Sequence, residues 1–85
     1  MDYVLTAHAR EEMARRQIDA AWVDAIMRHP EQIVAGLDNR EIRQGRIQTE
    51  SGVFLVRCIV EDWRNPPVLV TVYRTTKIAK YWRQE

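Results

Sequence analysis

Arg57 is the residue of this sequence whose type and position most strongly suggest chemistry. It falls in an apolar stretch that alternates like a β-strand, where a charged group is costly unless it is paired or hydrated. If the last two strands pair, Thr71 and Tyr73 would lie beside it. A guanidinium, a hydroxyl and a phenol on one face of a sheet would bind an oxyanion such as a phosphate. The alternative is structural, with Arg57 paired to an acid such as Glu61 or Glu41.

His8 is the candidate for proton transfer. It is the second residue of the first predicted helix, beside the free amides and the positive pole of the helix start, which favour a neutral imidazole. A neutral imidazole can act as a base near pH 7. If this helix end overhangs the sheet, His8 would approach Arg57 and Tyr73, and these three residues would be catalytic. The alternative is a half-exposed histidine that contacts a backbone carbonyl.

A run of cations follows the last predicted strand. Arg74, Lys77, Lys80 and Arg83 recur at three-residue spacing, interleaved with Tyr81 and Trp82. On a helical turn they would form a basic stripe with stacking rings, which suits RNA or another polyanion. The alternative is a solvated helix face whose rings pack on the sheet edge. The predicted substrate-binding residues are Gln44, Arg46, Thr71, Arg74, Thr75 and Lys77.

Two amphipathic helices are predicted near the N-terminus. Thr6 and Asp19 have the side chains of N-caps, and good helix formers follow each of them. The second helix should end at His29, because a residue before proline avoids the helical region. Its apolar face is the stronger one and consists of Trp22, Val23, Ile26 and Met27.

From residue 32 onward, the apolar pattern alternates instead. Strands are predicted over residues 32–35, 40–48, 53–61 and 68–74, with turns at 36–39 and 50–52. A bulge is expected at Gly45. In the last strand, strict alternation predicts that Val68, Val70 and Val72 face the core.

These elements predict an α+β domain over residues 1–85, with two N-terminal helices packed on one face of a roughly four-stranded antiparallel sheet. Because two helices shield one face only, the opposite face, with Arg57 and Tyr73, is expected to remain open to solvent. A short helical turn is expected around residues 76–82.

Composition excludes several classes of protein. One cysteine and two histidines predict no disulfide, metal cluster or cofactor, and Cys58 is expected in the core. The absence of a signal segment or a membrane-length apolar run predicts a cytosolic protein without a membrane partner. Charge is asymmetric: residues 1–42 carry five basic against eight acidic groups, and residues 43–85 carry eight against four. The excess in the second half favours an anionic partner, although a surface of mixed charge without a role is the alternative.

Several motifs together resemble a small uncharacterised bacterial family. They are Thr6-Ala-His-Ala-Arg, Met13-Ala-Arg-Arg-Gln-Ile-Asp, Arg43-Gln-Gly-Arg and Val70-Thr-Val-Tyr-Arg-Thr. This family looks similar to the RelE/ParE-type toxins, which implies a RelE-like fold. Some of those toxins are metal-independent ribonucleases that direct a 2′-hydroxyl at the adjacent phosphate, and others act on a gyrase. The chain departs from the pattern at Gln17, where the family has glycine, and in lacking an extended Lys/Arg-rich strand at its end.

The first functional hypothesis is therefore a toxin-like, metal-independent endoribonuclease domain, with RNA as substrate and an acidic or amphipathic antitoxin as partner. The second is a non-enzymatic module that binds protein or nucleic acid through the same face. A third is a self-associating domain, in which Leu55, Ile59 and Trp63 would form the patch of a homodimer.

Overall fold

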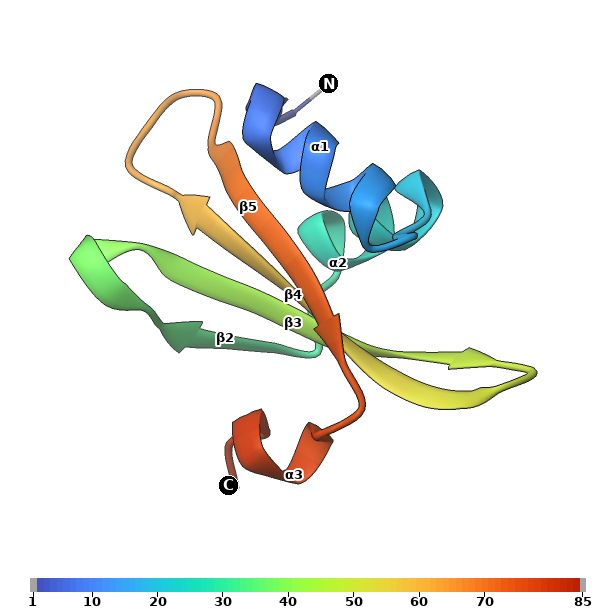
Figure 1. Ribbon diagram of the computed structural model, residues 1–85. Coiled ribbons are helices and arrows are strands. Elements are labelled where there is room, and N and C mark those ends of the chain that lie inside the picture. The colour runs from blue at the N-terminus through green and yellow to red at the C-terminus, as the bar shows by residue number, and fades with distance from the viewer. Residues whose placement is uncertain (1, 85) are drawn as a thin grey trace.

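A computed structural model describes residues 2–84, and one mixed five-stranded sheet forms the centre of the molecule (Figure 1). Along the chain the elements are β1 (Val4–Leu5), α1 (Ala7–Arg15), α2 (Ala20–Arg28), β2 (Gln32–Ala35), the 3₁₀ turn η1 (Leu37–Asn39), β3 (Glu41–Thr49), β4 (Gly52–Glu61), β5 (Val68–Thr75) and α3 (Ile78–Tyr81). The sheet order is β1-β5-β4-β3-β2.

The predicted α+β class is confirmed, but the expected set of four antiparallel strands is wrong. β1 pairs in parallel with β5, whereas the other neighbouring strands are antiparallel. A strand of two residues is too short to show an alternating pattern, so pairing alone defines it.

Both N-caps act as predicted. The Thr6 hydroxyl accepts a hydrogen bond from the amide of Ala9 at 3.0 Å and donates one to the carbonyl of Val70 at 2.8 Å. The carboxylate of Asp19 accepts from the amide of Ala21 at 2.9 Å. Thr6 therefore both starts α1 and ties that start to β5, which fixes the helix against the sheet.

The hydrophobic core lies between the sheet and the helices α1 and α2. α1 packs along β5, and α2 packs over β3 and β4 (Figure 1). The Trp22 and Phe54 rings meet edge to face, with centroids 5.1 Å apart. The buried core residues are Tyr3, Ala9, Ile18, Val23, Ile26, Met27, Phe54, Val56, Cys58, Val60, Leu69 and Val72.

An irregularity in β5 changes which residues of that strand face the core. Ile59 pairs with Thr71, but the next residue, Val60, pairs with Leu69, so Val70 is left without a partner on β4. The bulge places both Leu69 and Val72 on the helix side, where each is buried. The prediction that Val68 and Val70 would share the core face with Val72 is therefore wrong, and Val68 and Val70 are only half-buried.

Gly45 has a role in packing rather than in a bulge. The register between β3 and β4 runs without a break through Gly45, so the predicted bulge is absent there. A Cβ atom at this position would come within 2.4 Å of Cδ1 of Ile26. Glycine is needed because α2 lies this close to the strand.

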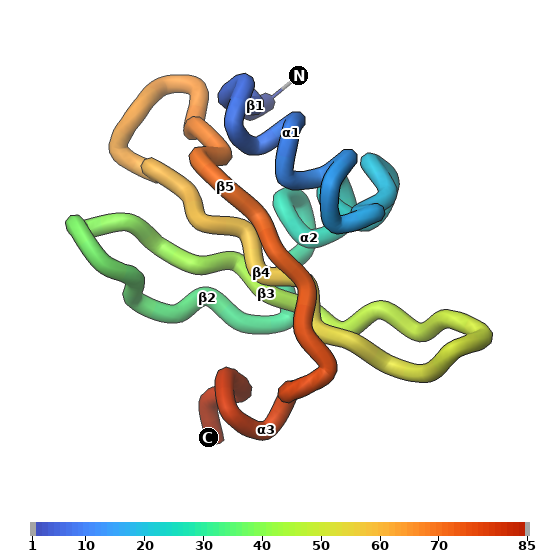
Figure 2. The backbone as a smooth tube through the Cα atoms, viewed as in Figure 1, coloured from blue at the N-terminus to red at the C-terminus, as the bar shows by residue number. Residues whose placement is uncertain are grey.

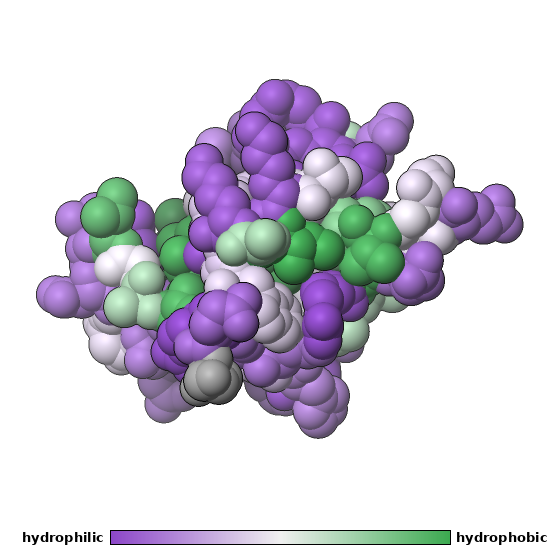
Figure 3. Space-filling view, turned by 90° about the horizontal axis from the view of Figure 1, so that it is seen from below, coloured by the Kyte–Doolittle hydropathy of each residue, from purple (hydrophilic) through white to green (hydrophobic). Residues whose placement is uncertain are grey.

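The third helix lies on the opposite side of the sheet from α1 and α2 (Figure 2). The expected helical turn near the C-terminus is thus confirmed, but the expectation of an open second face is wrong where α3 covers it. Seen from the α3 side, the surface is mostly hydrophilic, and hydrophobic residues form small groups (Figure 3). Of the predicted dimer strip, Leu55 is fully buried and Ile59 half-buried, while Trp63 is exposed on the loop before β5.

Candidate functional site

Four polar side chains form one row across the sheet, on the face that α3 covers. The strand register pairs Gln32 with Gln44, Gln44 with Arg57, and Arg57 with Tyr73. We call these four residues the polar cluster. Gln44 is fully buried, and Gln32 and Arg57 are only 8% and 7% exposed. The predicted proximity of Arg57 and Tyr73 is therefore present.

Hydrogen bonds link the whole row. Arg57 Nε donates to Gln44 Oε1 at 2.8 Å, and another nitrogen of its guanidinium donates to the Tyr73 hydroxyl. Gln44 Nε2 donates in turn to Gln32 Oε1 at 2.9 Å. The cluster thus holds a buried cation with neutral acceptors, and this arrangement differs from the ion pair considered for Arg57.

The two acids proposed as partners of Arg57 are engaged elsewhere. Glu61 binds Arg40 at 2.8 Å and Arg64 at 2.6 Å, which lowers the pKa of the Glu61 carboxyl. Glu41 binds Arg43 at 2.6 Å. Neither carboxylate is paired with Arg57.

The C-terminal segment closes over the cluster. Gln44 Nε2 donates to the carbonyl of Tyr81 at 3.2 Å, and Gln32 Nε2 donates to the carbonyl of Arg83 at 2.7 Å. The Tyr81 ring centroid lies 4.3 Å from the guanidinium carbon of Arg57, which is cation–π geometry. Sequence reasoning missed Gln32 and the role of Tyr81. The position of Gln32 opposite Gln44 on neighbouring strands is the signal that could have revealed Gln32.

His8 does not join the predicted catalytic set. It is exposed on α1, which packs on the helix side of the sheet, whereas the Arg57 and Tyr73 side chains lie on the α3 side. The sheet itself separates the two groups. The expectation that the start of the helix overhangs the Arg57 face is wrong, because α1 begins at β5 and runs over the core.

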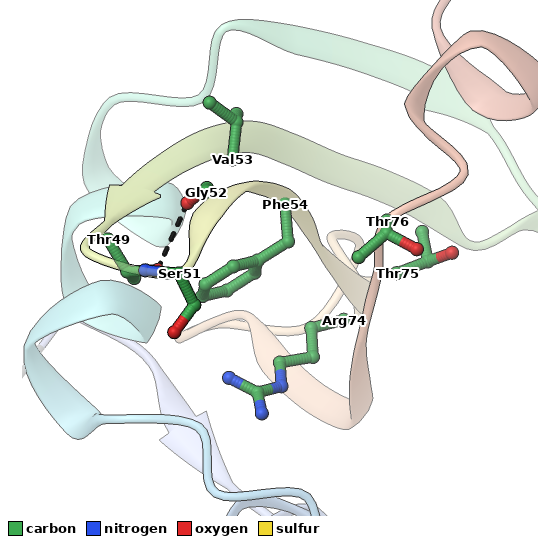
Figure 4. A pocket seen from close by; sticks show the side chains of 8 residues that line it. All are labelled: Thr49, Ser51, Gly52, Val53, Phe54, Arg74, Thr75 and Thr76. Carbon is green, nitrogen blue, oxygen red and sulfur yellow. Dashed lines mark hydrogen bonds between the residues drawn. The ribbon is translucent and has the colours of Figure 1, made fainter.

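Arg74 also points away from the polar cluster. It pairs with Val56 and so faces the helix side, where its guanidinium carbon lies 4.9 Å from the centroid of the Phe54 ring. It lines a surface hollow of about 620 Å³ between the β3–β4 hairpin and the end of β5 (Figure 4). The other lining residues are Thr49, Ser51, Gly52, Val53, Phe54, Thr75 and Thr76.

This hollow, which we call the Arg74 hollow, combines one cation with four hydroxyl-bearing residues. No carboxylate is among the residues that line it. The Thr49 hydroxyl is held by the turn, donating to the carbonyl of Gly52 at 3.0 Å, and the Thr75 hydroxyl accepts from the amide of Lys77 at 3.0 Å. Guanidinium and hydroxyl donors around an open space suit a phosphate oxygen.

The remaining predicted contact residues are dispersed. Arg46 binds Glu31 at 2.7 Å, which lowers the pKa of that carboxyl, and its guanidinium carbon lies 4.3 Å from the centroid of a Trp82 ring. Thr71 is half-buried opposite Ile59. These residues do not gather around the Arg74 hollow, so the predicted site is divided between the two faces of the sheet.

Positive charge without a nearby carboxylate is concentrated at the end of the chain. Among the described residues, the arginines that pair with a carboxylate include Arg15, Arg16, Arg28, Arg40, Arg43, Arg46 and Arg64. Within residues 2–84, Arg74, Lys77 and Lys80 have no carboxylate within ion-pair distance. The excess of basic residues in the second half of the sequence was the signal for these unpaired cations.

Cys58 lies in the core, as predicted. It is fully buried, and burial raises the pKa of its thiol to about 12. The thiol therefore stays protonated near neutral pH, unlike a nucleophilic cysteine. The residues that the structure describes contain no group of three His, Cys, Asp or Glu side chains that could hold a metal ion.

A mixed five-stranded sheet, two helices on one face and a polar row beneath a short third helix on the other define a small α+β domain. Residues 5–74 match the family described as "Domain of unknown function (DUF4258)", and the chain belongs to that family. No curated protein matches the chain, and no solved structure matches it either. In the part of the chain that is described, no helix is long and apolar enough to span a membrane.

Proposed function

We propose that the protein is a non-enzymatic nucleic-acid-binding module, and that its contact surface extends from the Arg74 hollow to α3. The observation that carries this proposal is the charge of one continuous segment. Arg74, Lys77 and Lys80 lie within seven residues of each other, and no carboxylate among the described residues pairs with them. Cations that are not already neutralised contribute most to contacts with phosphates.

The Arg74 hollow supports the same function. The Arg74 guanidinium carbon lies 4.9 Å from the centroid of the Phe54 ring, and hydroxyl-bearing residues share the lining of the hollow with it (Figure 4). An RNA phosphate in the hollow could accept from Arg74 while neighbouring phosphates meet Lys77 and Lys80. Phosphate contacts of this kind position a nucleic acid without reading its sequence.

The test measures binding of a fluorescent single-stranded RNA by anisotropy over a series of salt concentrations. Replacing Arg74, Lys77 and Lys80 by Gln should weaken binding at least tenfold near 0.1 M salt. Each lost phosphate contact should flatten the dependence of log K on log salt by about 0.7, hence by roughly 2 for the triple variant.

The matched control replaces three exposed arginines that already have acidic partners, Arg15, Arg64 and Arg28, by Gln. It removes the same formal charge from other parts of the surface, so RNA affinity and salt slope should change little. If both triple variants lose affinity equally, net charge alone governs binding and the proposed surface is wrong.

A metal-independent endoribonuclease, which the resemblance to RelE/ParE-type toxins suggests, is the second candidate. The contact of the Arg57 guanidinium with the Tyr73 phenol favours it. The guanidinium can stabilise a developing negative charge, and the phenol can transfer a proton. This activity would require the C-terminal segment to leave the cluster. An acidic antitoxin would then be expected to bind the cationic face.

Expression of the chain with measurement of growth and RNA cleavage tests this candidate. Tyr73→Phe retains the ring but removes the hydroxyl, so cleavage should fall by at least 100-fold, as for a lost general acid or base. His8→Ala should leave cleavage unchanged, because His8 lies across the sheet from this pair. A wild-type chain that neither arrests growth nor cleaves RNA would exclude the activity.

A further inference from the structure

The C-terminal segment is held to the sheet by contacts of the kind that proteins use for a bound peptide. At Trp82 the backbone leaves the helix and becomes extended, with φ −73° and ψ 123°. From there the main contacts come from sheet side chains to the backbone or rings of the segment. The hydrophobic core on the other face does not include residues of α3.

The Gln32 side chain both donates a hydrogen bond to the backbone of this segment and accepts one from it. Its Nε2 donates to the carbonyl of Arg83 at 2.7 Å, and its Oε1 accepts from the amide of the same residue at 3.0 Å. One side-chain amide thus bonds both the carbonyl and the amide of a single residue of the segment. Gln44 adds a third bond, from Nε2 to the carbonyl of Tyr81 at 3.2 Å.

Two rings supply the side-chain contacts. Tyr81 stacks over Arg57 and Trp82 over Arg46, each with 4.3 Å between the guanidinium carbon and the ring centroid. Arg57 is buried, and its guanidinium donates hydrogen bonds to the side chains of Gln44 and Tyr73. Removal of the Tyr81 ring would therefore expose a cation that has no carboxylate partner, and another aromatic ring could restore its contact.

We propose that the row formed by Gln32, Gln44, Arg46 and Arg57 is a peptide-binding groove, occupied in this structure by the chain's own C-terminal segment. Its ligand is an extended peptide with two consecutive aromatic residues followed by a residue whose backbone bonds Gln32. The aromatic side chains stack on the two arginines, and Gln32 and Gln44 bind the peptide backbone. The family match, residues 5–74, contains all four groove residues and ends before the segment that fills the groove.

The test uses the full chain and a fluorescent synthetic peptide with the sequence of residues 77–84, Lys-Ile-Ala-Lys-Tyr-Trp-Arg-Gln. In the wild type the attached segment competes at high effective concentration, so the peptide should bind weakly. In the full-length Tyr81→Ala/Trp82→Ala variant the attached segment loses both ring contacts. The peptide should then bind at least tenfold more tightly than it binds the wild type.

Two controls separate the groove from simple charge attraction. Adding Gln32→Ala to that variant should weaken peptide binding at least fivefold, whereas adding Gln48→Ala should not. Gln48 is an exposed glutamine of β3 whose side-chain amide donates to the carbonyl of the adjacent Thr49. A peptide of the same charge, with both aromatic residues replaced by Ala, should not bind.

Circular dichroism and thermal unfolding establish that each variant is folded, and the single Trp82→Ala chain replaces the double variant if that one is not. Absence of peptide binding to a folded variant, or equal binding with and without Gln32→Ala, would overturn the proposal. These measurements contain no RNA, so their outcome is independent of the proposed nucleic-acid surface.

Discussion

At the scale of single residues, Arg57 is the most unusual feature of this protein. The residue is 7% exposed, and the partners of its guanidinium are a glutamine oxygen, a phenol and an aromatic ring. Burial of a cation is costly unless good hydrogen bonds compensate for lost water. Here neutral groups supply those bonds, so loss of the side chain removes the donor to Gln44 Oε1, which is buried, and to the Tyr73 hydroxyl.

Truncation of Arg57 is therefore expected to destabilise the fold. Arg57→Ala should lower the free energy of unfolding by about 3 kcal/mol, because Gln44 loses a buried hydrogen bond and a cavity forms beneath Tyr81. Arg64→Ala, which removes an exposed arginine, should cost less than about 0.5 kcal/mol. Urea unfolding measures both, and similar values for the two variants would contradict this reading of the cluster.

At the scale of elements, the close packing of α2 on the sheet depends on Gly45, which has no side chain. The contact of Gly45 with Ile26 is so close that a Cβ atom could be accepted only if the buried Ile26 side chain or the helix that carries it moved. A rigid helix transmits such a movement along its length, so Val23 and Met27 would also lose packing against the sheet.

Gly45→Ala should consequently lower the free energy of unfolding by about 1–3 kcal/mol through overpacking. Ile26→Val removes the Cδ1 atom that the new methyl group would meet. In an Ile26→Val background the same Gly45→Ala change should therefore cost less than it does in the wild type. A double-mutant cycle from thermal or urea unfolding gives this coupling, and additive effects would show that the two residues do not collide.

Local patterns were sufficient for some elements and insufficient for others. The caps at Thr6 and Asp19 and the alternation of β4 depend on neighbours in the chain, and they were predicted correctly. The bulge at Val70 depends on pairing with β4, which local alternation cannot reveal. The burial of Arg57 and its separation from His8 depend on where α1 and α3 pack, so three of the four cluster residues were predicted as site residues, but Gln32 and the burial of the cluster were not.

At the scale of the whole molecule, the sheet divides the protein into two unlike layers. One side is an apolar core that contains the Cys58 thiol, and the other is a polar row under a short helix. Folding therefore removes Cys58 from water completely, which couples the stability of the molecule to alkaline pH.

The sign of this coupling follows from the raised thiol pKa. Above pH 9, the ordinary value, the unfolded chain loses the Cys58 proton, while the folded chain keeps it up to about pH 12. The unfolded state is favoured as pH rises through this window, so the stability is complete below pH 9 and is lost above it. Between pH 8 and pH 10.5 the wild type should lose roughly 2 kcal/mol more than Cys58→Ala, since each pH unit beyond 9 is worth about 1.4 kcal/mol.

Urea unfolding of both proteins at the two pH values measures this difference. Equal losses in the wild type and in Cys58→Ala would mean that other groups, such as Tyr3, whose pKa burial raises to about 12, account for the whole effect.

The parallel pairing of β1 with β5 determines where a label or fusion partner would lie relative to the sheet. β1 occupies the outer edge of β5, and the backbone near Val4 is hydrogen-bonded to the carbonyl of Pro67 at 2.9 Å. Arg83, in contrast, is bonded to Gln32 at the far edge of the sheet. A fluorophore, surface tether or fusion partner joined through the first residues would thus emerge beside β5, whereas one joined after Gln84 would emerge next to Gln32 and would sterically hinder the row of glutamines and arginines.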